Sequence, residues 1–160
     1  MRRRRCPRAS VLPLGWLVIA VVVAACESRS STPPASINYG QDVCAECDHV
    51  ISDRRFAAQY ALGAGTVKKF DDPGCLFRAL RRDSAAPTSV YFQDLLSDHW
   101  LSSTEAWFAN PPQLATPRGF GWAAYASFGE AQDAVTSGGG GQILQYEQAK
   151  QRVAPEDGRQ

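Results

Sequence analysis

Residues 70–76 have the sequence FDDPGCL, a pattern that predicts the end of a strand followed by the start of a helix. Asp72 has a side chain typical of a helix N-cap, and Pro73 suits the first helical position because the N–H that proline lacks has no intrahelical partner there. Apolar side chains then recur at helical spacing as far as Leu80. The sequence therefore predicts a helix that begins after Asp72 and ends in the basic and polar stretch 81–86.

A β-hairpin is predicted immediately before this helix. Residues 55–62 (RFAAQYAL) and 66–70 (TVKKF) flank Gly-Ala-Gly at 63–65, which is typical of a glycine-bearing three-residue hairpin loop. Residues 89–92 (SVYF) predict a short buried strand after the helix. The first half of the chain thus has the order strand, strand, helix, strand.

The second half of the chain repeats this order faintly. A strand is predicted at 121–126, and SFGE at 127–130 is a capping box that opens a helix. The glycines at 138–141 end that helix, and a strand returns at 143–146. The predicted fold class is α+β, with two small ββαβ-like units packed on one core. A single compact α+β domain is the alternative.

These patterns set the domain boundaries. A chain of 160 residues suits one ordinary domain or two very small ones. We place the folded domain at residues 37–152, with candidate halves of about 37–95 and 96–152. Residues 153–160 are predicted to form a disordered tail.

The N-terminus has the features of a secretory signal. Five arginines precede position 10, and an apolar run follows at 11–25. A helix over that run would cover about 22 Å, short of the roughly 30 Å hydrocarbon core, so a membrane-spanning helix is not expected. VAAC at 23–26 resembles a bacterial lipobox, in which the cysteine, here Cys26, is diacylated. Cleavage of the Ala-x-Ala type beside an incidental cysteine is the alternative.

Residues 26–36 are predicted to be this lipidated cysteine and a flexible tether. The segment 27–36 contains serine, threonine and proline but no large apolar residue, so it cannot bury enough surface to fold. Two acyl chains would anchor it stably. We therefore expect the domain on the periplasmic side of a bacterial membrane. The sequence does not distinguish the inner from the outer membrane.

Charge and motifs exclude several classes of protein. Removal of residues 1–25 takes five of the 17 basic side chains and none of the 16 acidic ones, which leaves a mildly acidic domain. Nucleic-acid binding favours a basic patch, so no nucleic-acid partner is expected. The sequence has no G-x-S-x-G, P-loop or Rossmann glycine motif and only two histidines. We expect neither an enzyme nor a small-molecule substrate.

Three of the five cysteines remain for chemistry once the signal is removed and Cys26 is lipidated. Cys44 and Cys47 form a C-x-x-C motif, which brings two sulfurs close enough to share one metal ion, and His49 adds a nitrogen donor. Thiolates select soft or borderline ions such as Cu(I), Zn(II) and iron–sulfur clusters. In an oxidising compartment a disulfide, structural or catalytic as in thioredoxin-like proteins, is the alternative.

Other donors are weaker candidates. Cys75 is the third residue of the predicted helix, where the helix N-terminus favours a thiolate, so we expect a lowered pKa and raised metal affinity. Its alternative role is that of a small apolar side chain packed under the helix. His99 is most simply a surface or packing histidine. Asp71 and Asp72 alone are too small a set for a hard-cation site.

These motifs together resemble those of the NosL family, the copper-chaperone lipoproteins associated with maturation of nitrous oxide reductase. The matching stretches are YG-x-D-x-C-x-x-C from residue 39, ISD-x-RFAAQ from 51, FDDPGCL from 70, TP-x-G-x-G from 116, AY at 124–125, and GG at 139–140 before Ile143 and Leu144. The C-x-x-C is generic, whereas FDDPGCL at its distance from the cysteines makes the resemblance specific.

The resemblance implies a fold of two small ββαβ units. It also implies a periplasmic protein that binds one Cu(I) and delivers it by ligand exchange to a copper enzyme, with nitrous oxide reductase the expected partner. This chain departs from the family where thioether donors are expected. Cys47-Asp48-His49 stands in place of Cys-x-Met, Arg118 replaces the methionine of Thr-Pro-Met-Gly, and Met1 is the only methionine. By position, the resemblance implies ligation by Cys47 and His49.

Cys44, with Cys75 or His99, would complete a two- to four-coordinate site. Imidazole in place of a thioether makes the site less purely soft, so it would lose part of its preference for Cu(I) over Zn(II). The alternative function is a lipoprotein interaction module stabilised by structural zinc or a disulfide, without copper delivery.

Overall fold

The computed structural model describes residues 33–153. Along this range lie η1 (Arg54–Phe56), β1 (Ala58–Ala61), η2 (Gly63–Gly65), β2 (Val67–Phe70), α1 (Pro73–Arg82), β3 (Ser89–Gln93), β4 (Trp100–Ser102), β5 (Trp107–Ala109), β6 (Ala123–Tyr125), α2 (Phe128–Ser137), β7 (Ile143–Gln145) and α3 (Tyr146–Arg152), where η marks a 3₁₀ turn. The predicted signal, Cys26, the start of the predicted tether and nearly all of the predicted tail lie outside the described residues. Within residues 33–153, no helix is long and apolar enough to cross a membrane.

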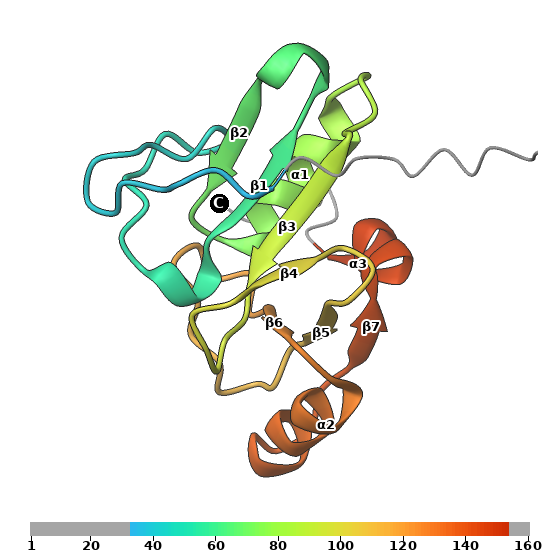
Figure 1. Ribbon diagram of the computed structural model, residues 1–160. Coiled ribbons are helices and arrows are strands. Elements are labelled where there is room, and N and C mark those ends of the chain that lie inside the picture. Colours follow the sequence, from blue (N-terminus) through green and yellow to red (C-terminus); the bar gives the residue numbers. More distant parts are fainter. Residues whose placement is uncertain (1–32, 154–160) are drawn as a thin grey trace, which may run out of the picture.

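The strands form two antiparallel sheets (Figure 1). One sheet has the order β2-β1-β3-β4 and the other has the order β6-β5-β7. In the first sheet, β1 pairs with β2, the next strand in the chain, and with β3, which follows the helix α1. In the second sheet, β5 pairs in the same way with β6 and with β7, which follows α2. The units β1-β2-α1-β3 and β5-β6-α2-β7 therefore share one topology. This arrangement confirms the predicted α+β class.

Both main helices begin where the sequence predicts. The Asp72 side chain accepts a hydrogen bond of 2.8 Å from Gly74 N–H, and a proline takes the first position of α1. α2 opens with a reciprocal capping box between Ser127 and Glu130 and ends at Gly138. Each cap satisfies backbone N–H groups that the first turn of a helix leaves unpaired.

Other boundaries differ from those predicted. β4 belongs to the first sheet and β5 opens the second unit, so that unit begins at β5 and not at about residue 96. The predicted strand 143–146 ends at Gln145, because Tyr146 opens α3. The strand predicted from residue 55 begins at Ala58, because the chain first makes η1.

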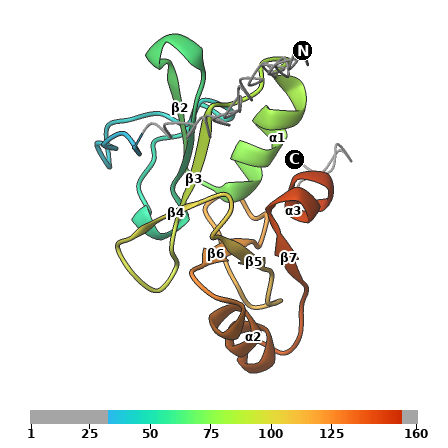
Figure 2. The ribbon, with the colours of Figure 1, turned by 45° about the vertical axis from the view of Figure 1, so that its right-hand side comes forward.

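The two units share one core. Phe77 of α1 lies 5.3 Å from Phe92 of β3 and 5.2 Å from Phe108 of β5, measured between ring centroids. Phe92 and Phe108 meet each other edge to face at 4.7 Å. α3 packs beside α1 (Figure 2), and its Tyr146 ring is 6.0 Å from Phe77. Aromatic pairs of this geometry contribute about 0.5–1.5 kcal/mol each beyond burial, so α1 binds the units together.

The loop between β5 and β6 packs on the start of α1. The Phe120 ring covers Gly74 so closely that a Cβ at Gly74 would overlap it. The Arg78 guanidinium lies 5.0 Å from the centroid of the same ring. Arg118 N–H donates a hydrogen bond of 3.0 Å to the buried carboxylate of Asp72. The second unit therefore helps to fix the residues at which α1 begins.

Gln59 of β1 holds the segment that precedes the domain. Its side-chain amide accepts a hydrogen bond of 2.8 Å from Ala35 N–H and donates one of 3.0 Å to the Ala35 carbonyl. The flexible tether predicted to reach residue 36 is thus fixed to the sheet at Ala35, because one amide satisfies both backbone groups there.

We expect Gly74→Ala to lower the free energy of unfolding by about 1–3 kcal/mol, because the added methyl group displaces Phe120. Gly129→Ala is a matched control, since Gly129 takes the same helical position in α2 and its Cβ would meet no atom closer than 3.8 Å. That control should be neutral or stabilising by up to about 1 kcal/mol. Urea denaturation compares the two, and equal effects would contradict the close packing of Phe120 on α1.

Candidate metal centre

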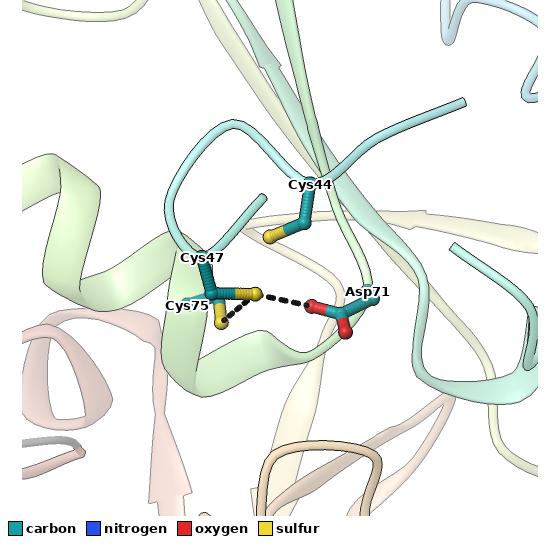
Figure 3. Close-up of side chains that lie close together, drawn as sticks. All are labelled: Cys44, Cys47, Asp71 and Cys75. Atoms are coloured by element: carbon teal, nitrogen blue, oxygen red, sulfur yellow. Dashed lines mark hydrogen bonds between the residues drawn. The ribbon is translucent and has the colours of Figure 1, made fainter. Parts of the chain in front are cut away.

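The C-x-x-C motif lies in a loop that closes on itself through backbone hydrogen bonds. Cys44 N–H donates to the His49 carbonyl at 2.8 Å, and Asp48 N–H donates to the Cys44 carbonyl at 3.1 Å. Asp48 has a φ of 58°, a left-handed conformation that aspartate tolerates better than most residues. The turn brings the side chains of Cys44 and Cys47 to one side, where they face the start of α1 (Figure 3).

Three contacts fix this loop on the first unit. Ala45 N–H donates to the Lys69 carbonyl of β2 at 2.9 Å. The Lys69 ammonium lies 2.6 Å from the Asp42 carboxylate, and its hydrogen bond lowers the pKa of Asp42. Glu46 pairs with Arg82, the last residue of α1, at 2.8 Å. The loop is thus held by β2 and by the C-terminal end of α1.

The junction between β2 and α1 supplies two further donors. Asp71 follows the last residue of β2, and Cys75 lies in the first turn of α1. Asp72 stands between them, is fully buried, and accepts the hydrogen bonds of Gly74 and Arg118 N–H. Because this cap fixes where α1 begins, it also fixes the directions of Asp71 and Cys75.

Four donor atoms meet where the loop faces this junction (Figure 3). The sulfurs of Cys44, Cys47 and Cys75 and a carboxylate oxygen of Asp71 all lie within 4.8 Å of one another. The sulfurs of Cys47 and Cys75 are 3.8 Å apart, and the Cys47 thiol donates to Asp71 Oδ1 at 3.5 Å. All three thiols are free, and only Cys47 is partly exposed. We call these four side chains the cysteine cluster.

The cluster contains three of the predicted ligands, Cys44, Cys47 and Cys75, but not His49. The His49 side chain is exposed and turns back along its own loop, with its Nδ1 2.8 Å from the carbonyl oxygen of Cys47. His99 is also exposed and lies outside the cluster. The prediction that an imidazole replaces the family's thioether therefore finds no support in the geometry.

Asp71 is the donor that the sequence analysis did not predict. Asp71 is 3% exposed, and its carboxylate accepts a hydrogen bond from the Cys47 thiol. Its position in the sequence could have indicated this role. Asp71 lies between the end of β2 and the N-cap of α1, so it must be close to the first turn of α1, which contains Cys75. Asp71 and Asp72 together are too small a set for a hard-cation site, but Asp71 alone lies beside three sulfurs.

The surroundings separate the acidities of the three thiols. A hydrogen bond from Cys75 lowers the pKa of Cys44 to about 7, whereas burial raises the pKa of Cys47 to about 11. Donation to Cys44, together with burial, raises the pKa of Cys75 above its ordinary value. The Cys75 thiol also lies within hydrogen-bond distance of the Cys47 sulfur, at 3.8 Å.

The expected lowering of the pKa of Cys75 is therefore wrong. The helix N-terminus does favour a thiolate, but the hydrogen bond that Cys75 donates to Cys44, burial, and the negative charges of Cys44 and Asp71 oppose it more strongly. Cys44 is thus the first of the three thiols to ionise as the pH rises. The three sulfurs of the cluster form a soft donor set suited to Cu(I) or Zn(II), and its carboxylate adds one harder donor.

The fold of this chain is similar to that of a solved protein. The crystal structure of the copper chaperone NosL from Shewanella denitrificans matches with a TM-score of 0.60 and 20% sequence identity, over 72% of this chain and 96% of that chain. The chain has a NosL-like fold. No protein-family model matches the sequence, and a search of curated proteins found no match. At this identity the likeness to NosL shows the fold alone, and the donor set must be argued from the cysteine cluster.

In the reduced, metal-free chain with Cys6→Ser and Cys26→Ser, we expect one thiolate to appear near pH 7, because Cys44 accepts a hydrogen bond from Cys75. The ultraviolet absorbance of thiolates measures this titration. Cys44→Ser should remove the step. First ionisation near the ordinary thiol value of about 8.5 would contradict the hydrogen-bonded cluster.

Proposed function

We propose that this domain holds one Cu(I) ion as cargo at the cysteine cluster and passes it to a copper enzyme, for which nitrous oxide reductase is the expected recipient. The observation that carries the proposal is the convergence of three free sulfurs within 4.8 Å, together with one carboxylate. The NosL-like fold supports it, because a solved protein with a similar fold is a copper chaperone. A chaperone binds without turnover, which agrees with an expectation of no enzymatic activity.

The choice of Cu(I) rests on the softness of the donors. Cu(I) is satisfied by two or three thiolates and gains little from a carboxylate oxygen. Asp71 would then stay a hydrogen-bond acceptor for Cys47 until the metal displaces that proton. The proposed ligands are therefore Cys44, Cys47 and Cys75, and His49 is not among them.

Structural Zn(II) is the second candidate, and Asp71 is the observation that favours it. Three thiolates and one carboxylate would complete the tetrahedral, four-donor shell that Zn(II) prefers. Such a closed site contributes folding free energy directly, so removal of the metal unfolds the domain. A copper chaperone should instead remain folded without its cargo.

Transfer of the ion would begin at Cys47. Cys44 and Cys75 are 0% and 1% exposed, whereas Cys47 is partly exposed. A donor from the recipient protein can therefore reach the metal beside Cys47 and replace it first, after which the buried thiolates release the ion in turn. A lipid anchor at Cys26 would place this exchange at the periplasmic face of a bacterial membrane.

A competition titration of the reduced full-length chain with Cu(I) and with Zn(II) tests the proposal. We expect one Cu(I) to bind and to outcompete Zn(II), with thermal unfolding still cooperative in the metal-free chain. Preferential Zn(II) binding, with loss of the folded state on chelation, would overturn copper delivery in favour of the structural-zinc function.

Variants assign the donors. We expect Cys47→Ser and Cys75→Ser to lower Cu(I) affinity by about tenfold or more, because each removes a thiolate. His49→Ala is the matched control on the same loop and should change affinity far less. Asp71→Asn should lower Zn(II) affinity more than Cu(I) affinity. A large effect of His49→Ala would contradict the cluster as the cargo site.

A further inference from the structure

Two thiols of the cysteine cluster are placed for oxidation as well as for metal binding. The sulfurs of Cys47 and Cys75 are 3.8 Å apart, and both thiols are free. A disulfide has an S–S distance of about 2.05 Å, so the two atoms need to approach by less than about 2 Å. Cys75 is fixed in the first turn of α1, whereas Cys47 lies in a loop outside any helix or strand. A small rearrangement of Cys47 can therefore close the bond.

We propose that Cys47 and Cys75 form a reversible disulfide by exchange with an external disulfide, and that this modification and metal binding at the cluster exclude each other. The second half of this statement rests on the proposed metal-binding function, and the first half does not. The external disulfide is a low-molecular-weight or protein disulfide of the compartment, for which oxidised glutathione serves as the probe.

The exposure of the sulfurs sets the order of the steps. Cys47 is the partly exposed thiol of the cluster, so an external disulfide reaches it before the buried Cys44, although Cys44 has the lower pKa. The small fraction of Cys47 that is deprotonated attacks one sulfur of the external disulfide and releases the other as a thiolate. The buried Cys75 then attacks the Cys47 sulfur of the mixed disulfide and releases the second external thiolate. The two protons lost by Cys47 and Cys75 go to these leaving thiolates. Two protein thiols are oxidised, and one external disulfide is reduced to two thiols.

Oxidation would dismantle the metal site. A Cys47–Cys75 disulfide leaves the Cys44 thiol and the Asp71 carboxylate as the remaining donors of the cluster. Two donors of such different softness hold neither Cu(I) nor Zn(II) tightly. By linkage, a metal that binds only the reduced cluster opposes oxidation, and each tenfold excess of metal over its Kd raises the midpoint potential by about 30 mV.

The test uses the full chain with Cys6→Ser and Cys26→Ser, so that only the cluster thiols react. The metal-free protein is incubated with oxidised glutathione and analysed by mass spectrometry of intact protein and of peptides. We expect loss of two hydrogens and a peptide linking Cys47 to Cys75. Cys44→Ser, the matched control, should still form this disulfide, and Cys75→Ser should stop at a glutathione adduct on Cys47. A Cys44–Cys47 link, or no disulfide, would overturn the proposal.

A second arm loads the same protein with one equivalent of Zn(II), which has no redox chemistry of its own. We expect oxidation to slow at least tenfold, and reduction of the disulfide to restore Zn(II) binding. Equal oxidation of loaded and metal-free protein would overturn the mutual exclusion. If the Cys47–Cys75 disulfide forms but the reduced protein does not bind Cu(I), copper delivery is rejected and the proposed disulfide is not.

Discussion

The Asp72 carboxylate is buried in the interior of the protein, where it accepts hydrogen bonds from the backbone N–H groups of Gly74 and Arg118. Burial raises the pKa of this carboxyl group, while the hydrogen bonds, including one from Thr116, lower it. A carboxylate in such a place is costly unless it is fully paired. The start of α1 and the loop between β5 and β6 must therefore stay together, or Asp72 loses its partners. This constraint joins the two ββαβ units at the point where the donors Asp71 and Cys75 lie.

The remaining donors depend on a second set of contacts, which holds the C-x-x-C loop on the opposite side of the cluster. Backbone pairing with β2 and an ion pair at the end of α1 fix this loop. The site is thus formed from two segments that are separated in the sequence and held together by contacts across the fold. Contacts within the protein alone hold these donors in place, which is compatible with the proposed binding and release of a metal ion. The cluster's single partly exposed sulfur, Cys47, would serve both metal exchange and thiol exchange.

Local signals in the sequence were enough for the elements with strong caps and turns. Asp72 and Ser127 each cap a helix as predicted, and the faint repeat became two units of the same topology. β4 and β5 were not predicted. Each has three residues, as β6 and β7 do, but β6 is followed by the Ser127 cap and β7 follows the glycines at 138–141, whereas no such signal lies beside β4 or β5. α3 was missed because Tyr146 continues an apolar run that has the composition of a strand.

The candidate site shows the same division. Spacing identified Cys44 and Cys47 as partners, since a C-x-x-C turn is a local structure. Spacing also favoured His49, but the left-handed Asp48 and the backbone pairing of Cys44 with His49 leave that ring outside the cluster. Asp71 could not be assigned from the sequence, because its role depends on how the loop and α1 meet. The acidities of the thiols likewise follow from contacts across the fold.

X-ray absorption at the metal edge of the loaded, reduced chain tests most directly whether the cysteine cluster is the metal site. We expect the nearest ligands to be mostly sulfur, at about 2.3 Å for Zn(II) with one oxygen donor and at a similar distance for Cu(I), without the more distant scattering of an imidazole ring. A shell with one sulfur and a histidine nitrogen would contradict this expectation, because His49 would then have to leave its place beside the Cys47 carbonyl to bind the metal.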